Sequence, residues 1–383
     1  MDAKKRVGLV YSYNENWIAG SYYILNIIHA LNTVEDKLKP KIILLTDSFK
    51  NFKKVKAETK YPYLTYCNFP FHANYSLFER GINKISKIIF NKKLIKKTAK
   101  IPEIDFLYPN EIKQLTKNFK KVNWIPDFQE EHLPHFFSQE EVVNRKEYQK
   151  SILVNSDAVV FSSEDAKKDF EKLYSESKAQ RFVLPFAVTH PDFSKERIDD
   201  LLDKYDLPKK YFFAPNQFWA HKNHIVILKA VKILKEKGIN VVVAFSGKEY
   251  DSRNLNNCNL LKKYILDNDL EKNIKFLGFL PRTEQLSLMN NSHAIIQPSL
   301  FEGWSTVVED AKALNKFIIL SDLAVHREQI DQNVHFFDAK DENQLSYVLA
   351  TYSSKDPKIK KLNYGSGIKT FGLNFLRLLD GNI

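Results

Sequence analysis

Short apolar runs alternate along the chain with longer segments in which apolar residues recur every three or four positions. Short runs are typical of buried strands, and the longer spacing is typical of amphipathic helices. In the first half, the pattern predicts strands over residues 7–11, 41–45, 122–125, 158–161 and 182–184, and helices over residues 22–31 and 166–174. Strands that alternate with helices indicate a parallel, doubly wound sheet of the α/β class.

The same pattern restarts after a polar segment that carries Pro191 and Pro208 near its ends. It predicts strands over residues 211–214, 241–246, 274–277, 294–296 and 317–320, and helices over residues 225–235, 260–266 and 362–379. We therefore expect two tandem Rossmann-like domains with an interdomain cleft. The expected bounds are 1–190 for the N-terminal domain, 191–208 for a linker, 209–361 for the second domain and 362–383 for a C-terminal helix that packs back across the junction.

The segment 294–328 is the most informative part of the pattern. A strand, an acidic loop, a helix and a second strand follow one another there, which predicts a βαβ unit. Ligands of open α/β sheets bind at the carboxyl ends of the strands. Glu302 and Glu309 lie at that end, where the first strand passes into the helix.

The start of this helix is a candidate phosphate site, because unpaired N–H groups and the helix dipole favour anions there. Ser305, Thr306 and Val307 would supply the N–H groups, and Glu309 could reach a sugar hydroxyl. The alternative is a capping box from Thr306 to Glu309, in which the glutamate serves only its own helix. Glu302 has no such structural role beside Gly303, which favours a binding role for it.

A second candidate loop, residues 215–223, follows the first predicted strand of the second half. Lys222 suits a phosphate as a point charge. Asn216 and Gln217 can donate neutral hydrogen bonds. The alternative is an ordinary polar loop with Asn223 as a helix cap, which would leave the Phe-Trp pair in this loop unexplained.

Two weaker candidates lie in the first half. Gly20 and Ser21 follow the first predicted strand without a G-x-G-x-x-G pattern, and a plain tight turn is the favoured interpretation. Asp127 comes just after the strand at 122–125 and could bind a substrate hydroxyl or satisfy the loop backbone. His132 and His135 have no metal-ligand pattern around them.

Residues 82–100 form a basic segment in which Ile82, Ile85 and Ile89 recur at helical spacing. The lysines expected to contact a membrane are Lys84, Lys87, Lys92, Lys93, Lys96 and Lys97. A basic amphipathic helix suits an anionic membrane surface. The alternatives are a solvated helix face and a nucleic-acid contact, which would have only phosphate attraction to support it.

The composition favours a globular protein and argues against disulfide-rich and membrane-spanning classes. The chain of 383 residues is 44% hydrophobic, enough for sizeable cores, and its net charge of +12 indicates either an anionic partner or a lysine-rich solvated surface. Two cysteines argue against a disulfide framework or a cysteine zinc site and favour a reducing compartment. Without an expected signal peptide or membrane span, we expect a cytoplasmic protein, with peripheral binding to the inner face of the cell membrane through the basic helix.

One combination of motifs carries a family resemblance. It consists of QPSLFEGW at residues 297–304, then Glu309, then Ser321 and Asp322, supported by residues 216–222 and 278–280. The combination resembles the GT-B glycosyltransferases, within the large retaining family that includes sucrose synthases and bacterial mannosyl- and rhamnosyltransferases (glycosyltransferase family 4, group 1 type). The likeness covers most of the second half and, more loosely, the first.

The resemblance implies a role for each motif. Glu302 would hold hydroxyls of the donor sugar, Glu309 would bind the ribose, and Lys222 would neutralise the leaving diphosphate. Lys222, Glu302 and Asp127 are the expected catalytic residues. The implied donor-binding set is Gly20, Ser21, Asn216, Gln217, Lys222, Phe279, Leu280, Glu302, Gly303, Trp304, Ser305, Thr306, Val307 and Glu309.

Three positions depart from the family pattern. Glu302 and Glu309 enclose six residues, where the family usually has seven. Gln217 stands where the family often has an arginine, and Pro126 stands where it has a histidine before the aspartate. With Gln217, one positive charge fewer stabilises the leaving group, and with Pro126, Asp127 has no histidine beside it to contact the reacting sugar.

The expected function is that of a retaining glycosyltransferase, which moves a sugar from a nucleotide-diphosphate sugar to a glycan or lipid-linked glycan in bacterial surface polysaccharide synthesis. We expect no metal or other cofactor and no nucleic-acid partner. One alternative is a nucleotide-sugar epimerase of GT-B fold, which would convert the donor without an acceptor. The other is an inactive GT-B module that binds membrane or nucleic acid, which the three departures favour.

Overall fold

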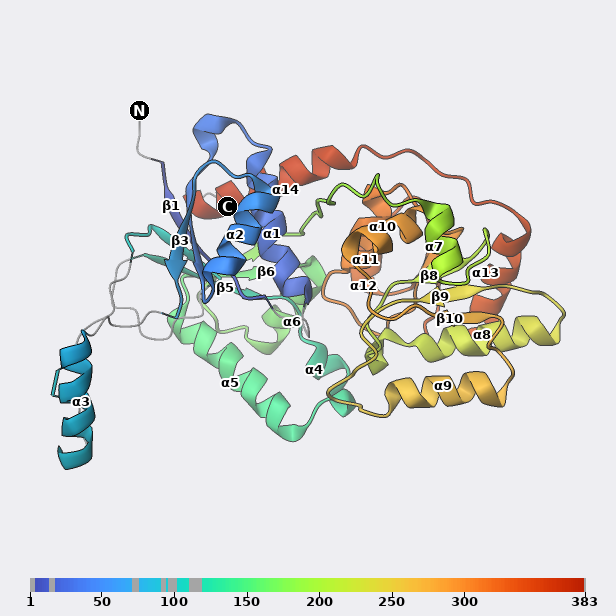
Figure 1. Ribbon diagram of the computed structural model, residues 1–383, viewed down its shortest axis with the longest axis horizontal. Coiled ribbons are helices and arrows are strands. Elements are labelled where there is room, and N and C mark those ends of the chain that lie inside the picture. Colours follow the sequence, from blue (N-terminus) through green and yellow to red (C-terminus); the bar gives the residue numbers. More distant parts are fainter. Residues whose placement is uncertain are drawn as a thin grey trace. The chain divides into compact units, whose positions relative to one another are not determined.

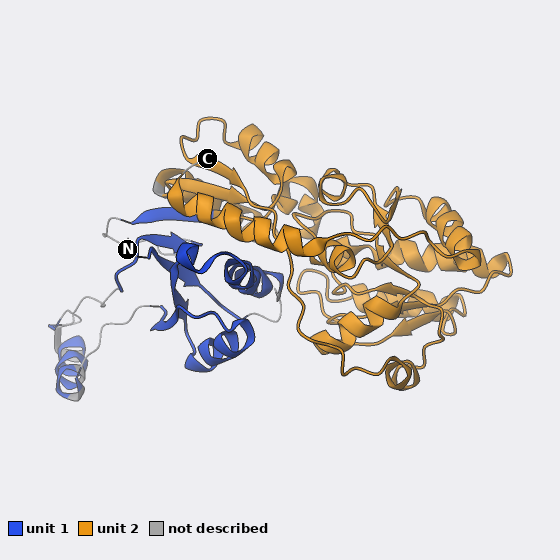
Figure 2. Cartoon of the chain, turned by 90° about the horizontal axis from the view of Figure 1, so that it is seen from above, with its two compact units in different colours: residues 1–123 blue, residues 124–383 orange. Residues whose placement is uncertain are grey.

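The computed structural model describes residues 4–13, 18–70, 76–90, 94–95, 102–109 and 119–381 (Figure 1). The chain divides into two compact units, residues 1–123 and residues 124–383 (Figure 2). The boundary between them lies inside one strand, β5 (Lys120–Ile125). Each unit is described by itself.

The first unit is built on parallel strands with an apolar interior. Its strands are β1 (Arg6–Val10), β2 (Lys41–Thr46), β3 (Leu64–Asn68), β4 (Phe106–Tyr108) and β5, and its helices are α1 (Ile18–Asn32), η2 (Asp36–Leu38), α2 (Phe49–Thr59) and α3 (Leu77–Phe90). β1 pairs with β2 on one side and with β4 on the other. Leu9 and Leu44 are fully buried between the layers.

The second unit begins with the rest of this strand series. It contains α4 (Gln129–His132), η3 (Pro134–Phe136), α5 (Gln139–Asn155), β6 (Ala158–Phe161), α6 (Glu164–Leu173), β7 (Gln180–Val183) and α7 (Ile198–Lys204). The first sheet has seven strands in the order β3-β2-β1-β4-β5-β6-β7. Helix α7 lies inside the segment 191–208 that the sequence suggested as a linker.

A second parallel sheet of six strands follows. Its strands are β8 (Phe212–Ala214), β9 (Val243–Phe245), β10 (Ile274–Phe276), β11 (Ala294–Gln297), β12 (Ile318–Ser321) and β13 (Val334–Phe337). They lie in the order β10-β9-β8-β11-β12-β13, so the direction of winding reverses between β8 and β11. Such a switch point is where doubly wound sheets bind ligands.

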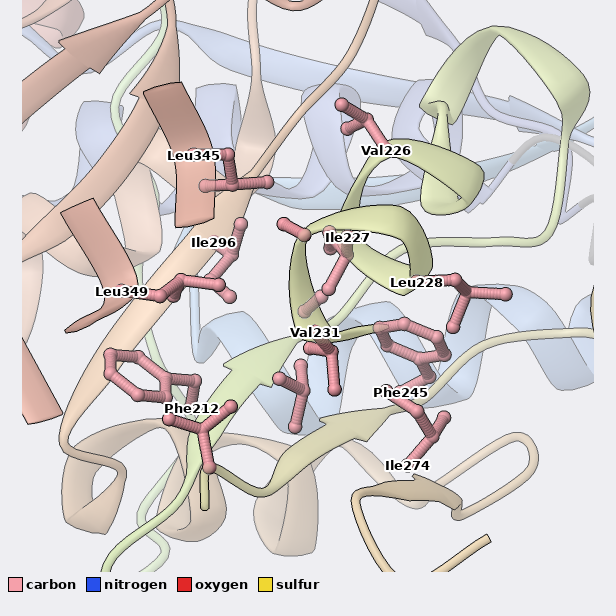
Figure 3. Close-up of a cluster of buried hydrophobic side chains, with 14 of the residues drawn as sticks. Phe212, Val226, Ile227, Leu228, Val231, Phe245, Ile274, Ile296, Leu345 and Leu349 are labelled. Atoms are coloured by element: carbon pink, nitrogen blue, oxygen red, sulfur yellow. The ribbon is translucent and has the colours of Figure 1, made fainter. Parts of the chain in front are cut away.

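Helices cover both faces of this second sheet, which explains why its strands read as continuous apolar runs. The helices of this part of the chain are η4 (Ala220–Lys222), α8 (His224–Glu236), α9 (Asn257–Asp267), α10 (Arg282–Asn291), α11 (Thr306–Ala313), α12 (Ala324–Gln329) and α13 (Glu342–Ser354). Helix α14 (Tyr364–Asp380) follows them and contacts α11. On one face, Ile227 and Val231 of α8 pack with Ile296 of β11 and Leu349 of α13 (Figure 3). Each buried methylene in such a core contributes about 0.8 kcal/mol.

The structure confirms the α/β class with two parallel sheets, and most of the predicted elements. β6 has the predicted bounds, and the predicted helix at 362–379 is α14. The pattern missed α2, β3, β4, α5, α10, α12, β13 and α13. Strand β3 has only Leu64 fully buried, and α5 has almost no apolar stripe, so neither carries a strong period in the sequence.

The prediction of a tight turn at Gly20 and Ser21 is wrong. Helix α1 begins at Ile18, so both residues lie in its first turn. Ser21 is buried, and its Oγ donates a hydrogen bond to Ser12 O at 2.8 Å. The helix therefore begins four residues earlier than the apolar spacing indicated.

Candidate active site

The two candidate loops of the second half meet at the switch point of the second sheet. β8 and β11 are neighbouring strands, and the loops 215–223 and 298–305 leave their carboxyl ends. A backbone hydrogen bond from Leu300 N to His221 O, 2.8 Å long, joins the loops directly. The fold thus brings Lys222 and Glu302 together from positions 80 residues apart.

Glu302 is held through one of its two carboxylate oxygens. Its Oε1 accepts hydrogen bonds from Lys222 Nζ at 2.6 Å, Gln297 Nε2 at 2.7 Å and Ser299 Oγ at 2.7 Å. Among the described residues, no donor reaches the second oxygen, Oε2. The carboxylate is therefore fixed in orientation and keeps one oxygen for a ligand. Gln297 and Ser299 were missed as site residues by the sequence analysis, although both polar side chains sit at the end of a buried strand.

Electrostatics keep this carboxylate ionised. Burial has the largest single effect and raises the pKa of Glu302, but Lys222, His326 and His221 together outweigh it and lower the pKa to about 2. Burial lowers the pKa of His221 to about 3 and also lowers the pKa of His326, so both neighbouring imidazoles are neutral. Lys222 is therefore the side chain that brings positive charge to Glu302.

Asp127 joins the site because Gly303 allows close packing. A Cβ atom on Gly303 would lie 2.5 Å from Pro126 O and 2.8 Å from Asp127 Cβ, which no other residue tolerates without a shift. Asp127 also accepts a hydrogen bond from Gln129 N at 3.1 Å, so it satisfies its own loop as well. Burial raises the pKa of Asp127, and Arg145 opposes that effect.

The start of α11 is capped differently from the prediction. Ser305 is the N-cap, and its Oγ accepts from Val308 N at 3.4 Å. Ser305 N, expected among the free donors, instead donates to Gln329 Oε1 at 3.1 Å. In the part of the chain that the structure describes, no acceptor takes up the N–H groups of Thr306 and Val307. These two groups are the donors that the helix start offers to an anion.

The capping box, the alternative considered for Glu309, does not form. Its carboxylate does not return to the helix start but accepts from Lys312 Nζ at 2.8 Å, from Gln329 Nε2 at 2.9 Å and from the Tyr364 hydroxyl. Tyr364 also accepts a hydrogen bond from Val188 N at 2.9 Å. Glu309 is buried, so α14 is tied to α11 through this carboxylate.

Asp310 is a further buried carboxylate, missed by the sequence analysis. It accepts from His190 Nε2 at 2.9 Å and from Arg282 at the start of α10. Burial raises the pKa of Asp310, but Arg282 and His190 together outweigh burial, so the pKa is lowered. The signal that could have found it is spacing, because Glu302 and Asp310 enclose the seven residues that the family pattern has.

Some residues of the loop after β8 pack into the hydrophobic core, and others lie at the candidate site. Phe218 is fully buried and stacks on His224 at 4.6 Å between ring centroids, which explains one member of the Phe-Trp pair. The guanidinium of Arg253 lies beside Trp219, with its Cζ 5.1 Å from the centroid of the tryptophan ring. The side chain of Asn223 does not cap α8 and instead donates to Pro298 O and Ala339 O, so that prediction is wrong. Asn216 is buried, and its Nδ2 has no partner among the described atoms.

The remaining candidates are distributed more widely. Leu280 is buried and Phe279 is exposed in the loop after β10, so Leu280 can offer a ligand only its backbone. Trp304 donates from Nε1 to Phe186 O at 3.1 Å. Gly20 and Ser21 belong to the first unit. Lys84 and Lys87 are exposed on α3, whereas Lys92, Lys93, Lys96 and Lys97 lie outside the described residues.

Two features are absent from the described residues. No three side chains of His, Cys, Asp or Glu gather there in a way that could hold a metal ion. None of the helices in the described ranges is both long enough and apolar enough to cross a bilayer.

The second half is similar to a known family of proteins. Residues 196–366 match the family model described as glycosyl transferases group 1. The O-antigen chain mannosyltransferase RfbU of Salmonella typhimurium is 22% identical over 205 residues, which cover 54% of this chain and 53% of that protein. The chain therefore spans about half the length of this curated relative.

Solved structures share the fold over nearly the whole chain. Anabaena Alr3699/HepE in complex with UDP and glucose has a TM-score of 0.62 at 12% identity, covering 100% of this chain and 96% of that one. Sucrose-phosphate synthase (tll1590) from Thermosynechococcus elongatus has a TM-score of 0.61 at 12% identity, covering 99% and 94%. The chain thus shares the GT-B fold of these structures, and its residues 196–366 are similar to the group 1 glycosyl transferases.

Proposed function

We propose that this protein is a retaining glycosyltransferase that moves a sugar from a nucleotide-diphosphate sugar to a glycan or lipid-linked glycan acceptor. The observation that carries the proposal is the asymmetry of Glu302, whose Oε1 is held by three donors while Oε2 has none in the described residues. A carboxylate oxygen presented in this way is an acceptor for a sugar hydroxyl. The group 1 family match and the GT-B fold support the same conclusion.

The donor would bind across the two loops at the switch point. The N–H groups of Thr306 and Val307 would bind the diphosphate at the start of α11. Lys222 would stabilise the negative charge that develops as the diphosphate leaves, which is the large electrostatic term in such a reaction. Because Lys222 already pairs with Glu302, donor binding would exchange part of that ion pair for a contact to phosphate.

The reaction would break the bond between the anomeric carbon and the diphosphate oxygen and form one to the acceptor oxygen. In the resembled family, the acceptor attacks from the face that the diphosphate leaves, so the configuration is retained without a protein nucleophile. The acceptor proton would pass to the departing phosphate oxygen. No metal or other cofactor would be needed, because Lys222 and the helix start would carry the charge.

The ribose contact has two candidate carboxylates. Glu309 is shared between Lys312, Gln329 and Tyr364. Asp310 has the family spacing from Glu302 and is held by Arg282, which follows Phe279 and Leu280 of the implied donor-binding set. We favour Asp310, because its partner Arg282 belongs to the element that follows Leu280. Nucleoside diphosphate affinity of Asp310→Asn and Glu309→Gln would separate them, with the larger loss expected for Asp310→Asn.

The acceptor would be reached at an anionic membrane surface through α3. Phe78 is 78% exposed and Ile85 is 59% exposed on this helix, together with Lys84 and Lys87. Exposed apolar side chains beside lysines are typical of helices that lie in a membrane interface. The O-antigen relationship of the relative RfbU supports a role in bacterial surface polysaccharide synthesis.

The test is a thermal-shift screen against UDP, GDP, dTDP, ADP and CMP, each with and without EDTA. A ligand that binds only the native state raises the melting temperature. We expect one diphosphate to do so, unaffected by EDTA, and its sugar nucleotide to be consumed with an acceptor. Conversion of the donor without an acceptor would favour an epimerase, and no shift with any nucleotide would favour an inactive binding module.

A further inference from the structure

A chain of polar contacts connects Asp127 to helices α5 and α6. Arg145 of α5 lies between two carboxylates, with its Nη1 2.9 Å from Glu130 Oε2 and 4.0 Å from Asp127 Oδ1. The guanidinium also lies over the ring of Phe137, 4.9 Å from its centroid. Arg145 is therefore restrained beside Asp127 by contacts of two kinds.

The anchor of Arg145 is itself fixed. The side chain of Glu130 is completely buried, and its Oε1 accepts a hydrogen bond from Gln149 Nε2. Gln149 Oε1 in turn accepts from the Tyr174 hydroxyl at 2.7 Å. Glu130 cannot turn away without leaving these buried groups unpaired, which costs about 1–3 kcal/mol for each group.

The charges that act on Asp127 come from three elements. Arg145 faces it from α5, Glu130 from α4, and Glu302 from the loop before α11, while Gln129 N–H donates to it at the start of α4. Burial raises the pKa of Asp127 most, Arg145 lowers it, and the two glutamates raise it further. Without Arg145, Asp127, whose side chain is 27% exposed, would face two negative charges, and these favour the neutral acid.

We propose that Arg145 is a positioning residue that holds Asp127 ionised and oriented beside Glu302. The proposal rests on the proposed function, and it adopts the sequence-based hypothesis that the ionised Asp127 accepts a hydrogen bond from a substrate hydroxyl. A protonated Asp127 would present a donor in place of an acceptor, so the hydroxyl would lose its partner. Arg145 itself touches no substrate in this scheme and acts through Asp127.

The direct test is a carbon NMR titration of the full chain labelled with ¹³C at the aspartate carboxyl carbons, without ligand. The Asp127 signal is the one missing from Asp127→Asn. Arg145→Gln is expected to move the Asp127 midpoint to higher pH, while Arg145→Lys, which keeps the charge, stays near the wild-type midpoint. Glu130→Gln removes a negative neighbour and is expected to move the midpoint to lower pH.

Lys146→Gln is the matched control. Lys146 is the next residue on α5, and its side chain is 45% exposed, against 37% for Arg145. The substitution removes the same charge, but Lys146 pairs with Glu131 at 2.9 Å and not with Glu130 or Asp127. An unchanged midpoint in Arg145→Gln, or an equal displacement in Lys146→Gln, would overturn the proposal. Melting temperatures of all variants check that each is folded.

The activity test uses UDP-glucose and GDP-mannose as probes. The acid limb of the pH profile of kcat/KM is expected to move to higher pH in Arg145→Gln. At the pH where the wild type is half active, the loss is expected to be roughly threefold, since a partly exposed arginine is screened by water. A displaced NMR midpoint with an unmoved acid limb would overturn the role in the reaction. A wild type inactive with both probes would count against the proposed function, while the NMR titration still tests the Arg145 contact.

Discussion

At the scale of single residues, the candidate site contains the ion pair of Lys222 and Glu302, for which we propose two different roles. Glu302 is oriented by three donors to one oxygen, and Lys222 supplies one of them. The nearby imidazoles of His221 and His326 are neutral, so they do not replace the charge of Lys222. Loss of Lys222 would therefore leave a buried carboxylate with two neutral donors and no counter-ion.

Lys222→Ala is expected to lower kcat strongly, because the leaving diphosphate loses its cation. By analogy with removal of one electrostatic donor, the cost is roughly 3–4 kcal/mol, or 10²–10³ in rate. Steady-state turnover of the nucleotide sugar identified in the binding screen measures it. Lys229→Ala is the control, because Lys229 pairs with Glu342 at 3.5 Å on the surface of α8. Turnover equal to wild type in Lys222→Ala would refute the assignment.

Gly303 is the residue whose size permits the site to form. Gly303→Ala would place a methyl group against Pro126 O at 2.5 Å, so the loop must shift. Overpacking of this kind costs about 1–3 kcal/mol, and we expect both the melting temperature and donor affinity to fall. Gly367→Ala on α14 is the comparison, since its Cβ meets nothing within 4 Å. That substitution should raise stability by up to ~1 kcal/mol, because alanine favours the helix. Equal effects of the two changes would contradict the packing argument.

At the scale of elements, α11 is the point where donor contacts and architecture meet. Its start is completed by Gln329 of α12, which bonds both the N–H and the C=O of Ser305, and its fourth residue, Glu309, holds α14. The two N–H groups left for a ligand, those of Thr306 and Val307, are therefore set by neighbouring helices as much as by α11 itself.

Tyr364→Phe tests the tie between α14 and α11. The change removes the donor to Glu309 and leaves Val188 N without its acceptor. A buried group left unpaired costs about 1–3 kcal/mol, which should appear as a lower free energy of unfolding in urea. Tyr347→Phe, at a tyrosine that is exposed on α13, should change stability little. If both variants unfold alike, the hydrogen bonds of Tyr364 do not hold α14 in place.

At the scale of the whole molecule, the order of strands decides where chemistry can occur. The reversal between β8 and β11 directs two loops of different sequence to one place, which brings Lys222 and Glu302 together. The net charge of +12 favours attraction to anionic surfaces over the molecule as a whole. Lys84 and Lys87 are exposed on α3, so the contribution of this helix to the attraction can be tested by substitution.

Binding to vesicles of phosphatidylglycerol and phosphatidylcholine is expected to weaken when Lys84 and Lys87 are both changed to glutamate. Each basic residue near an anionic membrane contributes about 1 kcal/mol, so the double reversal should reduce partitioning by tenfold or more, and added salt should reduce it further. Sedimentation with the vesicles measures the bound fraction. The same reversal at the exposed Lys358 and Lys361 is the control for net charge. Equal losses in the two double variants would show that net charge alone drives binding.

The sequence by itself determined the class of fold and indicated the two loops that we propose as the site of the chemistry. Burial imposes an apolar period on strands and helices, and turns require polar residues or glycine, so β6, β11, α8 and α14 could be read locally. Lys222, Glu302 and Asp127 could be named because they follow strands of such a sheet.

Only the tertiary structure decided which atoms of these residues are free. Within the described ranges one oxygen of Glu302 has no donor, Ser305 N–H is taken by Gln329, and Glu309 accepts from Tyr364, and each of these outcomes depends on groups far apart in sequence. Asp310 was missed for the same reason, because its partners His190 and Arg282 come from other segments. A local pattern reports burial and turns, whereas the pairing of buried polar groups is fixed only when the elements pack together.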